Sequence, residues 1–168
     1  MVSFHLAYTA PINPSDASPT LTVPQVWAGM ERKAKNAHEF VPAITECVVE
    51  KEEVNEKGHV VVTRVVKFKE GMGPPGDVRE VCVHFKPAKV DYHQENGSLI
   101  TNIISNGPSG KPEDMYMTFA FDWLHPELED EDGKEARKLK ERYQRVAKMA
   151  VDTTIDTIRR LVQEGEIQ

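Results

Sequence analysis

The chain has 168 residues and a formal net charge of −6 at pH 7. That length suits one domain, so residues 1–168 are expected to fold as a single unit. An acidic chain lacks the basic face that a nucleic-acid binder needs, and no apolar run approaches the ~18 residues of a membrane span. Two cysteines without paired spacing favour reduced thiols in a cytoplasmic protein. Oligomeric state is left open.

The N-terminal part predicts one strand and a helical segment. Residues 2–10 alternate between apolar and polar side chains, and the proline-containing residues 11–19 read as a loop. Thr22 and Gln25 have the spacing of a capping box at the start of a helix, and Pro42 ends the helical region. The apolar stripe of this helix comprises Val23, Val26, Trp27, Met30, Ala34 and Ala37.

Six strand-like segments follow the helical region. They cover residues 43–54, 59–69, 79–85, 89–94, 98–106 and 114–123. An Asn-Gly pair at residues 96–97 is typical of a tight hairpin turn between the fourth and fifth of these segments. Short strands joined by such turns predict an antiparallel sheet.

The turn at residues 55–58 sets the register of the first two of these strands. Pairing Val54 with His59 sorts apolar residues to one face and complementary charges to the other. The expected opposite pairs are Val49 with Arg64, Cys47 with Val66, Thr45 with Phe68, Glu46 with Lys67 and Glu50 with Thr63. Arg64 then lies on the apolar face. Its guanidinium needs an acceptor, which could be a ligand oxygen, an internal carboxylate, or water reached along the strand.

The last third of the chain predicts one long helix over about residues 133–164. No proline and no internal glycine interrupts it, and Arg159 and Arg160 near its end suit the helix dipole. About thirty residues at ~1.5 Å each span about 45 Å, enough to cross a small domain. We expect its C-terminal half to anchor the core and its N-terminal half, with Tyr143 and Val146, to cover a pocket.

This order of elements resembles the helix-grip fold of the SRPBCC superfamily, which includes START domains, polyketide cyclases and birch-pollen allergens. More narrowly, the chain resembles the AtaL-like branch. The segments that carry this resemblance are TNII at 101–104, MTFAFDW at 117–123 and AVDTTIDTIR at 150–159. The resemblance implies an α+β fold in which a seven-stranded antiparallel sheet wraps around the long C-terminal helix. One or two short helices follow the first strand.

The resemblance also implies an internal cavity that binds an apolar, partly oxygenated small molecule. Any catalysis would be cofactor-free: cyclisation, isomerisation or dehydration of a polyketide- or peptide-derived metabolite. Arg64 or Tyr143 would stabilise negative charge on a carbonyl oxygen, and a histidine or glutamate at the cavity mouth would move a proton. The alternatives are a non-catalytic carrier or sensor of a lipid-like ligand, and an interaction module with a filled core.

The expected site combines a few polar groups with apolar walls, as small-molecule sites do. Arg64 and Tyr143 are the catalytic candidates. The ligand-binding candidates are Tyr8, Trp27, Met30, Val62, Asn102, Tyr116, Met117, Phe119, Val146 and Ala150. No zinc-ligand spacing is present, so no metal and no cofactor is expected. The glycine-rich residues 71–76 lack the lysine of a phosphate-binding loop and are interpreted as a strand connector, which the resemblance allows to act as a lid.

Overall fold

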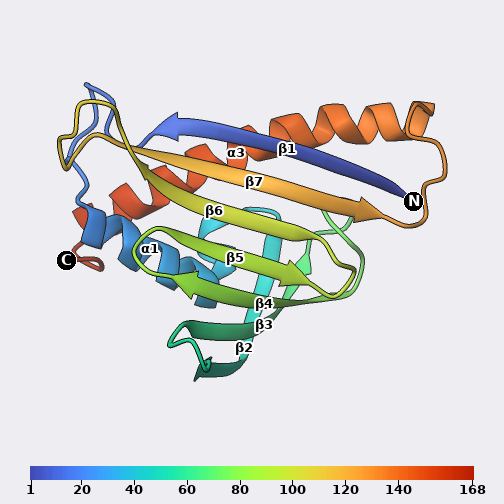
Figure 1. Ribbon diagram of the computed structural model, residues 1–168, viewed down its shortest axis with the longest axis horizontal. Helices are drawn as coiled ribbons and strands as arrows, with labels where there is room; N and C mark the ends of the chain where they lie inside the picture. Colours follow the sequence, from blue (N-terminus) through green and yellow to red (C-terminus); the bar gives the residue numbers. More distant parts are fainter.

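The computed structural model describes residues 1–168 and shows one sheet with three helices. Along the chain the elements are β1 (Val2–Pro11), α1 (Val23–Lys35), α2 (Ala37–Phe40), β2 (Ile44–Val54), β3 (Val60–Phe68), β4 (Asp77–Phe85), β5 (Lys89–Gln94), β6 (Leu99–Asn106), β7 (Met115–His125) and α3 (Lys134–Gln163). The seven strands are antiparallel, in the spatial order β1-β7-β6-β5-β4-β3-β2. Helix α3 crosses one face of this sheet, and α1 lies beside the C-terminal half of α3 (Figure 1).

The expected helix-grip architecture is confirmed, including the two short helices after the first strand. The predicted capping box is also present. The backbone N–H of Thr22 donates to Oε1 of Gln25 at 2.9 Å, and the backbone N–H of Gln25 donates to Oγ1 of Thr22 at 3.4 Å. These bonds satisfy donors that the first turn of α1 cannot pair internally.

The register between β2 and β3 agrees with the prediction only in the middle of the strands. The expected pairs of Arg64 with Val49, Val66 with Cys47 and Lys67 with Glu46 are confirmed. The other expected pairs, Val54 with His59, Glu50 with Thr63 and Thr45 with Phe68, are wrong. The register shifts between Ile44 and Glu46 and between Val49 and Lys51. Each shift inserts one unpaired residue, which bends and twists this edge strand, and the turn residues alone could not reveal it.

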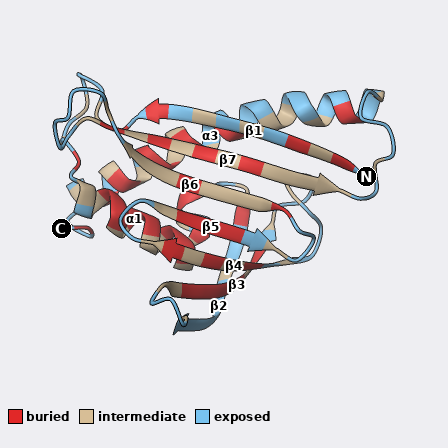
Figure 2. Cartoon of the chain, viewed as in Figure 1, coloured by how far each residue is buried: buried red, intermediate tan, exposed pale blue.

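The core lies between the concave face of the sheet, α1 and the C-terminal half of α3 (Figure 2). The buried residues of α3 are Ala136, Ala147, Val151, Thr154, Ile155, Ile158 and Leu161. A Cβ atom added at Gly29 of α1 would stand 2.4 Å from Cγ1 of Ile158, so glycine permits the close contact between these helices. The C-terminal half of α3 is therefore tightly packed, as expected, whereas only Ala136 is buried in the first three turns.

Both cysteines are free thiols, with Cys47 half-buried and Cys82 buried. Burial raises the pKa of the Cys82 thiol to about 12, so this side chain is an uncharged member of the core at neutral pH. None of the three helices is apolar over a stretch long enough to cross a membrane.

Candidate functional site

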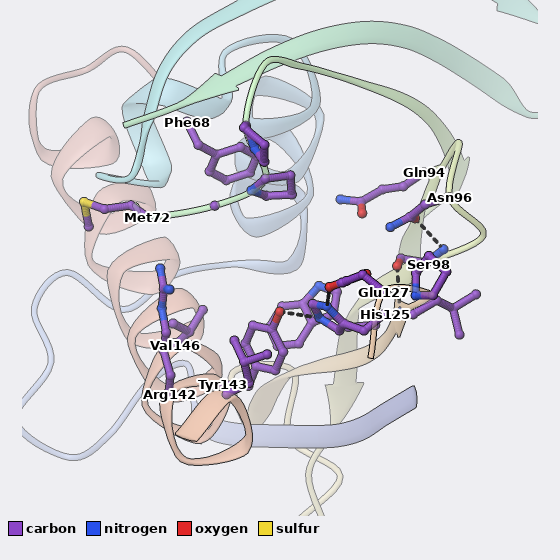
Figure 3. Close-up of a pocket in the computed structure, with 17 residues that line it drawn as sticks. Phe68, Met72, Gln94, Asn96, Ser98, His125, Glu127, Arg142, Tyr143 and Val146 are labelled. Carbon is purple, nitrogen blue, oxygen red and sulfur yellow. Dashed lines mark hydrogen bonds and ion pairs between the residues drawn. The ribbon is translucent and has the colours of Figure 1, made fainter. Parts of the chain in front are cut away.

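A cavity of about 500 Å³ lies between the N-terminal half of α3 and one end of the sheet (Figure 3). Four segments form its wall: the β3–β4 loop, the β5–β6 hairpin, the end of β7 with the residues that follow it, and α3. The side chains that line it include Phe68, Met72, Pro74, Gln94, Asn96, Ser98, Trp123, His125, Glu127, Leu139, Arg142, Tyr143 and Val146. This volume is within the ~300–1,000 Å³ of small-molecule sites. The glycine-rich connector between β3 and β4 forms part of the wall.

A relay of Glu127, His125 and Tyr143 runs along this wall (Figure 3). His125 Nδ1 lies 2.5 Å from Oε1 of Glu127, and His125 Nε2 lies 2.6 Å from the hydroxyl oxygen of Tyr143. The hydrogen bond with the imidazole holds the pKa of Glu127 below its usual range. An ionised carboxylate only accepts hydrogen bonds, so Nδ1 must donate to it. In a neutral imidazole Nε2 then accepts, and the hydroxyl of Tyr143 donates to it.

Aromatic packing fixes the ring of Tyr143. The ring of Trp123 lies 3.9 Å away between centroids, and the ring of Phe4 lies 5.5 Å away in an edge-on arrangement. Burial raises the pKa of Tyr143, which keeps its phenol protonated at neutral pH. The arrangement therefore presents a neutral hydroxyl with a defined direction to the cavity and a proton acceptor behind it.

Arg142 is the one lysine or arginine among the residues that line the cavity. Its Nη2 donates to the backbone oxygen of Gly71 at 2.7 Å, which ties α3 to the β3–β4 loop. The positive charge also favours the phenolate form of Tyr143 and so opposes the effect of burial on the pKa of that residue. Arg142 can thus stabilise negative charge that develops on an oxygen in the cavity.

Arg64 lies on the buried face, as expected, but not among the residues that line the cavity. Its Nε and Nη2 donate to Oε2 of Glu80 at 2.8 and 2.6 Å, and its Nη1 donates to the last carbonyls of α1. The sequence allowed three possible acceptors for Arg64, and the structure shows the second of them, an internal carboxylate. Nε2 of Gln94, a residue of the cavity wall, donates to Oε1 of Glu80 and connects this ion pair to the cavity.

Of the expected site residues, Tyr143 and Val146 line the cavity and the others do not. Trp27, Met30, Val62, Asn102, Met117 and Phe119 are buried deeper in the core. Ala150 packs at the edge of that core, and the hydroxyl of Tyr8 accepts a hydrogen bond from Lys148. Tyr116 faces away from the interior, because neighbouring residues of a strand point to opposite faces and Met117 is buried.

Sequence reasoning missed His125 and Glu127, which the structure places at the centre of the cavity wall. The last strand was expected to end at Trp123, whereas β7 extends to His125. A histidine in register with the inward Trp123 and Phe121 was the available signal, because side chains two residues apart share a face.

A long C-terminal helix across the concave face of a seven-stranded antiparallel sheet defines a helix-grip fold, with a cavity between the two. The family described as "Acetylaranotin biosynthesis cluster protein L" matches residues 6–165, and the chain belongs to this AtaL family. The protein of that name from Aspergillus terreus is 24% identical over 170 residues, which cover 99% of this chain and 94% of the relative.

Solved structures show the same fold at low sequence identity. The di-domain ARO/CYC protein StfQ from the steffimycin biosynthetic pathway matches with a TM-score of 0.64 and 12% identity, over 98% of this chain and 52% of StfQ. The di-domain ARO/CYC protein BexL from the BE-7585A pathway matches with a TM-score of 0.60 and 14% identity, over 93% of this chain and 50% of BexL. The chain thus spans about half the length of each. The Polyketide_cyc-like protein Cgl2372 from Corynebacterium glutamicum matches at 0.53 and 14%, over 96% and 93% of the two chains.

Proposed function

We propose that this protein binds an apolar, partly oxygenated small molecule of secondary metabolism in the cavity and catalyses a cofactor-free proton transfer that leads to ring closure, isomerisation or dehydration. The relay of Glu127, His125 and Tyr143 on the cavity wall carries this proposal. The similarity to a biosynthesis-cluster protein and to proteins named as ARO/CYC and Polyketide_cyc-like supports the substrate class.

In the proposed step, a carbon acid next to a ligand carbonyl loses its proton to the oxygen of Tyr143. The hydroxyl proton of Tyr143 moves at the same time to Nε2 of His125, and Glu127 stabilises the imidazolium that forms. The electron pair left on carbon becomes an enolate, whose oxygen Arg142 can stabilise. Attack of the enolate carbon on a second carbonyl would close a ring, and the relay would return the proton to the new alkoxide.

Deuterium exchange into a model ketone tests the proton transfer without knowledge of the natural ligand. We would incubate 2-tetralone with the protein in D₂O and follow deuterium at its α-carbons by NMR. The wild-type protein should accelerate exchange over buffer, and Tyr143→Phe and His125→Gln should each lower the rate by about 10²-fold or more, as loss of a general acid–base group does.

His5→Gln provides a matched control. His5 Nδ1 lies 2.6 Å from Oδ1 of Asp122, so it also forms a histidine–carboxylate pair, but both side chains are exposed on the other face of the sheet. This variant should exchange deuterium at the wild-type rate. Equal rates for wild type and Tyr143→Phe would refute the catalytic proposal and leave the carrier as the remaining function for the cavity.

A further inference from the structure

A second cluster of polar groups lies deeper in the core, around Lys33 of α1. Only 6% of Lys33 and none of Asn102 is accessible to solvent. Nζ of Lys33 donates to Oδ1 of Asn102 at 2.7 Å and lies 4.1 Å from the ring centroid of Phe119 and 5.6 Å from that of Tyr92. Burying an amine among aromatic rings costs free energy, because the amine loses its hydrogen bonds to water. Nζ of Lys33 replaces these bonds with one hydrogen bond, to Asn102.

The donors of this cluster outnumber its acceptors. The hydroxyl of Tyr92 and Nδ2 of Asn102 are buried and have no hydrogen-bond partner. Burial raises the pKa of Tyr92, so its hydroxyl keeps its proton and can donate. Each unpaired buried group costs about 1–3 kcal/mol, and an oxygen atom placed among these donors would remove that cost. The neighbouring carboxylate of Glu80 accepts hydrogen bonds from Arg64 and Gln94, and none from Lys33, Tyr92 or Asn102.

The cluster shares its sheet face with the cavity. Ser98 lines the cavity, and Asn102 lies four residues further along β6 on the same face. At ~3.3 Å per residue this places Asn102 about 13 Å deeper in the fold. Tyr92 lies two residues from Gln94 of the cavity wall, on the same face of β5. The cluster around Lys33 therefore lies on the inward sheet face whose outer end forms the cavity wall.

We propose that Lys33, Tyr92 and Asn102 form an inner polar subsite that binds a carbonyl or hydroxyl oxygen of an apolar ligand, deeper in the core than Tyr143. The proposal rests on the proposed function in that the ligand enters through the same cavity. Burial, together with the nearby charge of Arg64, lowers the pKa of Lys33 to about 7, so much of the amine is neutral at that pH. A neutral amine can also react with a carbonyl carbon. Covalent modification of Lys33 by a carbonyl compound would therefore report that the compound has reached the subsite.

Reductive alkylation with benzaldehyde tests whether an apolar carbonyl compound reaches Lys33. The amine and the aldehyde form an imine and release water, and cyanoborohydride then reduces the C=N bond to a stable secondary amine. Peptide mapping by mass spectrometry at pH 7 would give the yield at each lysine. Lys33 should be modified at least ten-fold more than the exposed Lys57 or Lys111, because an ordinary lysine with a pKa of about 10.4 is almost fully protonated there.

Tyr92→Phe removes a hydroxyl that has no partner in the protein. If that hydroxyl binds the ligand oxygen, this variant should keep wild-type stability but lose at least three-fold of the labelling at Lys33. Exposed lysines labelled while Lys33 stays unmodified would overturn the proposal, and so would labelling at Lys33 that Tyr92→Phe leaves unchanged.

Tyr143→Phe separates the two proposals. It should abolish deuterium exchange at the cavity wall but leave labelling of Lys33 intact. If the wild-type protein accelerates deuterium exchange but Lys33 is not labelled, only the inner subsite is refuted. If Lys33 is labelled but the wild-type protein does not accelerate exchange, only the catalytic function is refuted.

Discussion

The stability of the protein should depend on pH through Lys33, and Lys33→Met isolates this dependence. Burial lowers the pKa of Lys33 from 10.5 in a model peptide to about 7 in the folded chain. Between these values the unfolded chain binds more protons than the folded one, so stability rises with pH in this window. The slope is about 1.4 kcal/mol per pH unit, which gives about 2 kcal/mol between pH 7.5 and 9.

Methionine keeps an unbranched chain of similar length but carries no titratable amine. Lys33→Met should therefore be the more stable protein at pH 7.5, and its advantage over wild type should shrink by about 2 kcal/mol by pH 9. Urea unfolding followed by tryptophan fluorescence measures both proteins at each pH. Burial raises the pKa of Cys82 and of Tyr92, so both side chains stay protonated in the two folded proteins over this range of pH and their contributions cancel in the difference.

Met30→Leu is the control for this experiment, because Met30 is fully buried in the same helix and does not titrate. Its difference from wild type should be constant over the same range of pH. A constant difference for Lys33→Met as well would refute the reasoning, since it would show that the amine has the same pKa in the folded and unfolded chains.

Three further changes test other parts of the structure. Gly29→Ala forces a methyl group against Ile158 and should lower the free energy of unfolding by about 1–3 kcal/mol in urea titrations. Glu80→Gln leaves the buried guanidinium of Arg64 without a charged partner and should cost about 3–5 kcal/mol; a loss below about 1 kcal/mol would contradict its burial. Glu127→Gln should slow deuterium exchange about ten-fold or more at pH 7 but change stability by less than about 1 kcal/mol, because that carboxylate is mostly exposed.

The fold could be predicted from the sequence because local signals and periodicity agree along the chain. The capping box at Thr22, the Asn-Gly turn at residues 96–97 and the uninterrupted last helix each determine an element without help from distant residues. The bulges of β2 could not be predicted in the same way. They place Glu50 2.8 Å from Arg79, an ion pair between strands that are not neighbours, and only the twist of the finished sheet brings these side chains together.

The candidate site was harder to predict because its groups are polar and distant in sequence. His125 and Tyr143 belong to different elements. Glu127 is one of several acidic residues between positions 127 and 132, and the sequence does not indicate which of them pairs with a histidine. Lys33 follows Met30 by three residues, at the spacing of the buried stripe of α1, so its position was visible although its charge argued against burial. The inward face of β4 carries Glu80, Cys82 and His84, and Glu80 pairs there with Arg64, so the alternation of apolar residues along this strand does not mark its buried face.

The uneven burial of α3 has a consequence for how the proposed ligand would enter and leave the cavity. Its last four turns pack on α1 and the sheet, whereas its first three turns bury one residue and cover the cavity. Backbone amides in those first turns should therefore exchange with deuterated solvent through local opening, at a lower free energy than amides near Ile158. The hydrogen bond from Arg142 to Gly71 must break in that opening, so under the proposed function we expect the fraying of this helix to control access to the cavity.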